Sequence, residues 1–132
     1  MDITDKLNMT MLCDFYELTM GNGYLEAGLK DRITVIFDAF YRSNPCNNGY
    51  SICAGLERII AYIQDLHFSE EDIEYLRSKD LFSERFLDYL RDFKFTGDVW
   101  AIPEGTPIFP REPIITVRAP AIQAQLVETF LL

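Results

Sequence analysis

The sequence predicts an α/β domain in which a few helices pack on a mixed sheet. A capped helix near the amino terminus is followed by β-branched and aromatic residues over 33–41. The apolar spacing then becomes helical after residue 55 and returns to strand and turn after residue 96. The 132 residues support one domain with a modest core, and 48% apolar residues are enough to fill it.

The first helix is predicted over residues 15–27. Asp14 can accept a hydrogen bond from a free backbone N–H of the first turn, and Glu17 can reach back to the N–H of Asp14. This pattern predicts a capping box at the start. Gly28 can adopt the left-handed conformation that ends a helix, and Leu29 can then fold back on the last turn.

One face of this helix combines a large aromatic with small residues, by spacings of three and four. It holds Tyr16, Met20, Gly23 and Ala27. Gly21 and Gly23 each weaken a helix by about 1 kcal/mol relative to alanine. We therefore expect close contact along this side of the helix.

The segment 33–41 has apolar residues on both alternating faces, which favours a central strand. A loop follows over 43–49, in which Asn and Gly can accept positive φ. Residues 50–53 form a short strand candidate.

Three helices are predicted in the middle of the chain. The first follows Gly55 and should bury one apolar stripe, formed by Leu56, Ile59, Ile60 and Ile63. Ser69 and Ser83 are start signals for the next two, because each follows a Phe that can pack on the first turns, and Ser69 also precedes three acidic residues. The last of the three should end near Phe93.

The carboxyl-terminal third alternates like strands and turns. A strand is predicted after Thr96, a turn over 103–106 and a return strand over 114–117. Three prolines keep the segment 107–113 off any central ladder. Pro120 opens a last helix with a single apolar stripe, formed by Ile122, Leu126 and Phe130.

Composition narrows the classes of partner. Twelve Lys and Arg against 21 Asp and Glu give a net charge of −9, which disfavours nucleic acid and anionic membrane. Three cysteines without a CxxC pair indicate neither a disulfide framework nor a zinc site. There is no signal-peptide pattern and no stretch of membrane-spanning length, so we expect a cytoplasmic protein.

Several segments resemble the start of nicotinate phosphoribosyltransferase. The family pattern Asp-Leu-Tyr-Gln-Leu-Thr-Met, followed by Gly-Tyr-Trp-Glu-Ala-Gly, corresponds to residues 14–28. Five further motifs stand in the family's order and at close to its spacings, at 40–45, 54–57, 95–99, 103–106 and 125–129. The resemblance covers nearly the whole chain.

The resemblance implies that residues 1–132 are the amino-terminal α+β domain of a type II phosphoribosyltransferase, without its α/β barrel domain. A helix ending on three apolar residues, Phe130 to Leu132, also resembles an interruption, and we expect this helix to be buried by another copy of the chain. The complete enzyme would be a homodimer. The isolated fragment is predicted to be inactive.

The implied reaction transfers phosphoribosyl from phosphoribosyl pyrophosphate to the ring nitrogen of nicotinate, giving nicotinate mononucleotide and pyrophosphate. ATP hydrolysis would assist, and Mg would neutralise the pyrophosphate. Quinolinate and nicotinamide phosphoribosyltransferases are alternatives of similar architecture. A non-catalytic binding or assembly module is the alternative if the natural chain ends at Leu132.

Tyr16 is the one substrate-binding residue that the resemblance implies. The tyrosine of the Asp-Leu-Tyr motif lies against the pyridine ring of nicotinate, in a site that a neighbouring subunit completes. Offset stacking is worth about 0.5–1.5 kcal/mol beyond burial and orients the ring without taking part in bond making. Without the family, Tyr16 is more simply a half-buried aromatic on a helix.

Two other polar residues have competing interpretations. Asp14 could touch substrate, but a helix cap explains it fully. Arg42 could bind a phosphate or carboxylate with two hydrogen bonds, and a salt bridge to an acidic residue of the chain is the alternative.

No catalytic residue and no metal ligand is assigned in this chain. Glu104 lies in a Pro-Glu-Gly turn and Glu128 on a helix, and their spacing does not support a catalytic dyad. The family couples ATP hydrolysis through a phosphorylated histidine of the barrel, a position that His67 does not match. We therefore interpret His67 as a surface or linker residue.

Overall fold

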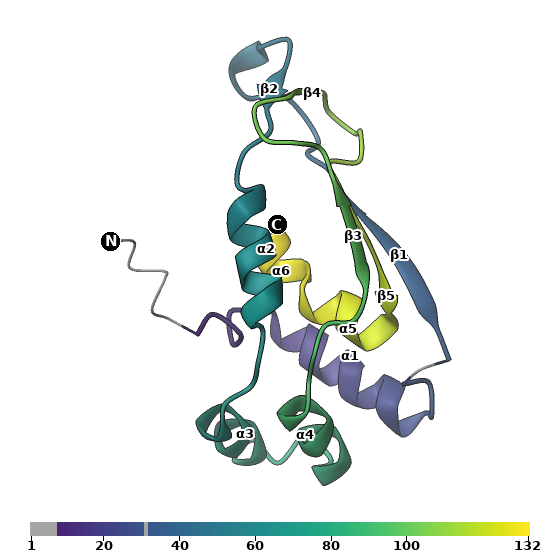
Figure 1. Ribbon diagram of the computed structural model, residues 1–132. Coiled ribbons are helices and arrows are strands. Elements are labelled where there is room, and N and C mark those ends of the chain that lie inside the picture. Colours follow the sequence, from purple (N-terminus) through teal and green to yellow (C-terminus); the bar gives the residue numbers. More distant parts are fainter. Residues whose placement is uncertain (1–7, 31) are drawn as a thin grey trace.

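The computed structural model describes residues 8–30 and 32–132. Its main sheet has three strands, β1 (Thr34–Ala39), β3 (Asp98–Ala101) and β5 (Ile115–Pro120), in the order β1-β5-β3. Helices cover one side of this sheet and leave the other side open (Figure 1). The predicted class of helices packed on a sheet is confirmed. The described strand pairs are all antiparallel, however, rather than mixed.

The central strand is β5, not β1. Ile115, Val117 and Ala119 of β5 are buried against the helices, and β5 pairs with a strand on each side. The segment 33–41 was predicted to be central because both of its faces are apolar. Within the described chain β1 is an edge strand, and its Ile36 side chain is 63% exposed because no element covers the outer face of the sheet.

Helix α1 (Phe15–Glu26) packs on α5 (Ala121–Leu126), which in turn packs on β1 and β5. All six residues of α5 are buried, as expected for a helix enclosed by a sheet and another helix. The stop signal of α1 is confirmed. Gly28 has φ of 72°, and the Leu29 N–H donates to the Tyr24 carbonyl oxygen at 2.9 Å.

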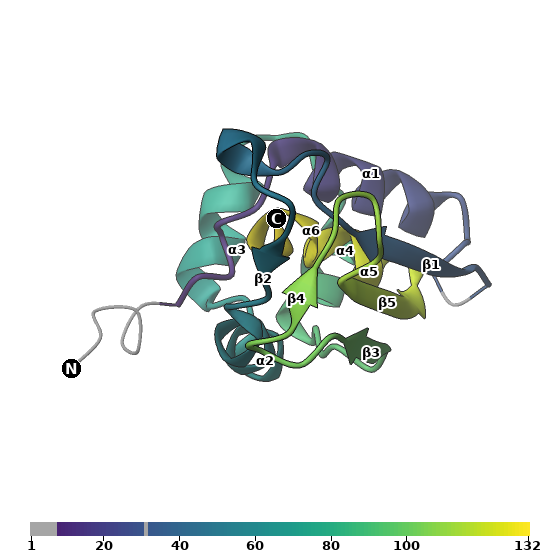
Figure 2. The same ribbon diagram turned by 90° about the horizontal axis from the view of Figure 1, so that it is seen from above.

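The predicted last helix is two short helices. After α5 the backbone bends at Val127, and α6 (Glu128–Leu131) follows. Figure 2 shows α6 between α1 and α2 (Leu56–Asp65). The Phe130 ring of α6 stacks on the Tyr62 ring of α2 at 3.8 Å between centroids. Part of the apolar end of the chain is therefore covered by the chain itself.

Helices α3 (Glu70–Arg77) and α4 (Glu84–Arg91) pack on each other at the end of the domain opposite β2 and β4 (Figure 1). Both start signals are confirmed. The Ser69 hydroxyl accepts from the Asp72 N–H at 3.2 Å, and the Asp72 carboxylate accepts from the Ser69 N–H at 2.8 Å. The Ser83 hydroxyl accepts from the Phe86 N–H at 3.1 Å.

The apolar stripe predicted for α2 is only partly buried. Ile60 is 44% exposed, and Leu56, Ile59 and Ile63 are intermediate, because α2 stands beside the main core rather than on it. Tyr62 is the one buried residue of this helix. Helix α2 therefore buries its predicted apolar stripe only in part.

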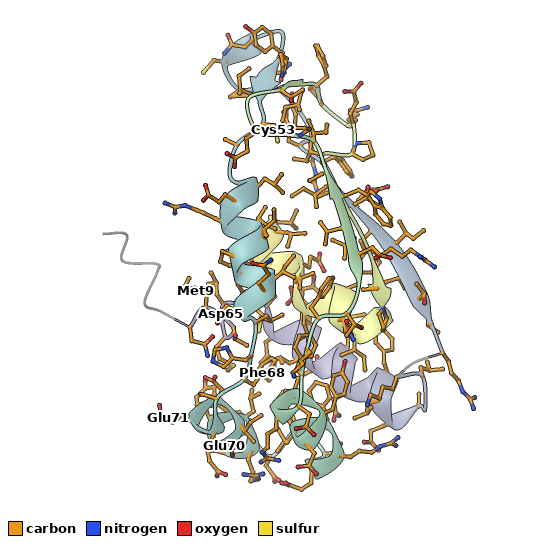
Figure 3. All side chains as sticks on the ribbon, viewed as in Figure 1. Met9, Cys53, Asp65, Phe68, Glu70 and Glu71 are labelled. Carbon is orange, nitrogen blue, oxygen red and sulfur yellow. The ribbon has the colours of Figure 1, made fainter. Side chains whose placement is uncertain are left out.

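A second, two-stranded sheet pairs β2 (Ser51–Ile52) with β4 (Pro107–Ile108), away from the central ladder as the prolines predicted. Figure 3 places Cys53 where this sheet joins the body of the domain. In the preceding loop, a 3-10 turn spans Pro45–Asn47. Here Cys46, rather than an Asn or Gly, has positive φ, at 55°.

Candidate functional site

Tyr16 lies in the first turn of α1, and its side chain is 42% exposed. The face of α1 that carries Tyr16 is exposed to solvent. Met20 is 39% exposed, and a methyl group added at Gly23 would meet nothing within 4 Å. The close contact expected on this side occurs instead at Gly21, whose added methyl would lie 3.1 Å from the Phe86 ring. The Tyr16 ring is therefore open to a binding partner.

The carboxylate of Glu128, at the start of α6, lies near the hydroxyl end of Tyr16. Hydrogen bonding to the Glu128 carboxylate is the main cause that raises the Tyr16 pKa to about 12, followed by burial and the nearby carboxylate charges. Glu128 itself accepts from the Gln125 side-chain amide at 2.8 Å. The phenol hydroxyl thus lies near a carboxylate while the ring stays exposed.

Glu17, the next residue, points the other way and is fully buried. Its Oε1 accepts from the Thr129 backbone N–H at 3.0 Å and from the Thr129 hydroxyl at 2.6 Å. Its Oε2 is buried and has no hydrogen-bond partner among the described residues. Burial raises the pKa of Glu17, although the two bonds from Thr129 oppose the shift.

The predicted capping box on Asp14 is wrong. The Asp14 side chain makes no capping bond. Its backbone N–H, which Glu17 was expected to reach, donates to the Thr129 hydroxyl at 3.0 Å. Glu17 turns inward because Thr129 offers two donors, so a distant residue replaces the local cap.

Two motifs of the sequence therefore meet at one place. Tyr16 of the first motif lies near Glu128 of the last on the exposed side. Glu17 of the first motif is bonded to Thr129 of the last on the buried side. The sequence predicted a binding role for Tyr16 and none for Glu128. The signal that could have paired them is that both residues belong to segments that resemble the same family.

Glu104 has a structural task. Its Oε1 accepts from the N–H groups of Gly55 at 2.8 Å and Glu57 at 3.3 Å, which caps the start of α2. Arg42 is exposed, and no hydrogen bond or ion pair joins it to another residue of the described ranges. The salt bridge weighed for Arg42 is therefore not found there.

His67 is an exposed residue of the linker between α2 and α3, as predicted. Its backbone N–H donates to the Thr10 hydroxyl at 3.1 Å, and its carbonyl oxygen accepts from the Asn8 amide at 3.2 Å. This linker therefore holds the segment that leads into α1.

Across residues 8–30 and 32–132, no three His, Cys, Asp or Glu side chains are grouped as metal ligands. Among the same residues, no helix has the length and apolar character needed to cross a membrane. What the arrangement around Tyr16 offers chemically is an exposed aromatic face close to carboxyl groups.

Comparison with known proteins gives one consistent result. Residues 11–132 match the family described as nicotinate phosphoribosyltransferase (NAPRTase) N-terminal domain. The chain is 43% identical over 122 residues to nicotinate phosphoribosyltransferase pncB2 of Mycobacterium tuberculosis strain H37Rv, covering 92% of this chain and 26% of that protein. Identity to nicotinate phosphoribosyltransferase of Bacillus subtilis strain 168 is 38% over 125 residues, covering 95% of this chain and 25% of that protein.

The fold agrees with these matches. The crystal structure of human nicotinic acid phosphoribosyltransferase superposes with a TM-score of 0.80 at 30% identity, covering 89% of this chain and 24% of that chain. The chain thus spans about a quarter of the length of the relatives that it matches. It belongs to the nicotinate phosphoribosyltransferase family and matches the N-terminal domain of that family.

Proposed function

We propose that the full-length protein forms nicotinate mononucleotide and pyrophosphate from nicotinate and phosphoribosyl pyrophosphate, with ATP hydrolysis, in the salvage of NAD. The observation that carries this proposal is the family match, which runs from residue 11 to residue 132 and so includes every motif of the chain. Magnesium would neutralise the pyrophosphate. Catalysis would then consist chiefly of positioning and charge neutralisation.

The part proposed for this chain is to present the Tyr16 ring to the pyridine ring of nicotinate. The exposed ring of Tyr16, carried on the first turn of a helix that packs on the domain, supports this role, because an accessible aromatic can stack on a flat ring. The carboxyl groups of Glu128, Glu17 and Asp14 disfavour an anion at the phenol end. Nicotinate would therefore direct its own carboxylate away from Glu128.

The phosphates would be held elsewhere in the full-length protein. A chain with a net charge of −9 is a poor site for phosphoribosyl pyrophosphate and ATP, which are both anions. The same charge disfavours nucleic acid and anionic membrane as partners. We further propose a cytoplasmic homodimer in which the second subunit completes the site at Tyr16.

Turnover of the full-length protein tests the function. We expect nicotinate mononucleotide to form when nicotinate, phosphoribosyl pyrophosphate and magnesium are supplied, and to form faster when ATP is added. Quinolinate and nicotinamide, each at the same concentration, are the comparison substrates. Faster turnover of either one, or no product with nicotinate, would overturn the proposal.

A further inference from the structure

We propose that Glu17 is a positioning residue: through Thr129 it holds the start of α6 so that Glu128 lies against the Tyr16 hydroxyl, which fixes the ring that faces nicotinate. The mention of nicotinate rests on the function proposed above. The positioning itself concerns only this chain and can be measured without any substrate.

The geometry places two residue pairs side by side. Glu17 and Thr129 form the buried one, with two hydrogen bonds of 3.0 and 2.6 Å. Tyr16 and Glu128, the residues immediately before them, form the outer pair, in which the carboxylate lies near the phenol hydroxyl. Because neighbours on a helix are fixed in rotation and rise relative to each other, locking the buried pair restricts where the exposed pair can meet.

The Asp14 backbone adds a third bond to the same hydroxyl. Its N–H donates to the Thr129 Oγ1 at 3.0 Å, and that oxygen donates in turn to Glu17. The start of α1 is therefore tied to the start of α6 on both sides of Tyr16. Gln125 holds Glu128 from within the α5–α6 segment at 2.8 Å, so the carboxylate is constrained from two directions.

Packing alone does not account for a carboxyl group at this position. Glu17 is fully buried, and its Oε2 has no partner among the described residues, which is an unfavourable state for an acid. An amide would keep the acceptor that Thr129 uses, and an aliphatic side chain would fill the space. These two replacements therefore separate the acceptor function from charge and volume.

The test places 3-fluorotyrosine at position 16 of the full-length protein and follows its ¹⁹F signal through a pH titration. Fluorination lowers the phenol pKa and brings the titration into a milder range. Glu17→Gln should keep the elevated pKa of the ring, whereas Glu17→Leu should lower it toward that of a free fluorotyrosine. Glu71→Gln, an exposed charge on the distant helix α3 (Figure 3), is the matched control.

Two results of this titration would overturn the proposal. Glu17→Leu could titrate like the wild type, in which case Glu17 does not act on Tyr16. Glu17→Gln could fall as far as Glu17→Leu, in which case the charge of Glu17 acts directly and its bonds to Thr129 are irrelevant. If Glu17→Leu does not fold, Thr129→Val against Thr129→Ser answers the same question, with the valine variant expected to lower the ring pKa.

Kinetics connect the positioning to the reaction. Loss of a stacking contact corresponds to about a 2- to 12-fold rise in the KM for nicotinate, and we expect this from Glu17→Leu with kcat little changed. The double variant with Tyr16→Leu should be no worse than Tyr16→Leu alone, because both act through one ring.

The two proposals fail in different ways. An unchanged KM in Tyr16→Leu would refute the stacking role of the tyrosine, and the fluorine titration would still decide the role of Glu17. An unchanged titration in Glu17→Leu would refute the positioning role even if Tyr16→Leu raised the KM.

Discussion

The Glu17 carboxylate accepts two hydrogen bonds from Thr129, a residue 112 positions further along the chain, at 3.0 Å from its N–H and 2.6 Å from its hydroxyl. These bonds join the first turn of α1 to the first turn of α6 and enclose the acid completely. The exposed Tyr16 ring therefore lies beside a contact between two helices that neither helix could form alone.

Stability should depend on pH through Glu17. Its pKa is raised above the ordinary value of 4.5, so the folded state binds this proton more tightly than the unfolded chain does. Its contribution to stability is fully present below pH 4.5 and is lost as the pH rises through the folded-state pKa. Urea unfolding between pH 5 and 8 should therefore show Glu17→Gln gaining stability relative to the wild type as the pH rises. A constant difference between the two proteins would contradict this.

The two glycines inside α1 should respond oppositely to alanine. Gly23 faces open space, so Gly23→Ala should raise the free energy of unfolding by about 1 kcal/mol through helix propensity. A methyl at Gly21 would lie 3.1 Å from Phe86 and 3.3 Å from Ile122, both fully buried, so Gly21→Ala should lower it by about 1 kcal/mol. Urea denaturation of both variants measures the difference, and equal effects would show that Phe86 can yield.

Glu104 should matter for stability and not for the chemical step. Glu104→Ala removes the acceptor for Gly55 and Glu57 and should lower the free energy of unfolding by about 0.5–2 kcal/mol, as for loss of a helix cap. Glu104→Gln keeps an acceptor oxygen and should stay close to the wild type. Glu112→Ala, an exposed acid of a nearby loop, is the control for charge. A large loss of kcat in a stable Glu104→Gln variant would reopen a catalytic role.

The three cysteines should differ in reactivity. Cys46 is exposed, whereas Cys53 is buried and the pKa of Cys13 is raised to about 11, chiefly by burial and then by Glu17. Brief treatment with iodoacetamide at pH 8, followed by peptide mass spectrometry, should find the label at Cys46. Cys46→Ser should remove the fast reaction. Rapid labelling of Cys13 would indicate that the start of α1 opens readily.

Much of the fold could be predicted from sequence, whereas the substrate contact of Tyr16 stays a prediction. The family, the exposed Tyr16 position and the helix starts at Ser69 and Ser83 were identified this way. The partner of Tyr16 was not, because Glu128 carries no local mark of its task. Only the folded chain places that carboxylate beside a phenol more than a hundred residues away.

By itself, the sequence determined those features whose hydrogen bonds lie within a few residues, such as the Ser69 cap and the turn at Gly28. The tertiary structure decided which of the apolar strands is central and whether Glu17 caps its own helix. The physical reason is competition. Glu17 had a local acceptor role available at Asp14, and two donors on Thr129, brought close only by packing of α1 on α5, outweighed it.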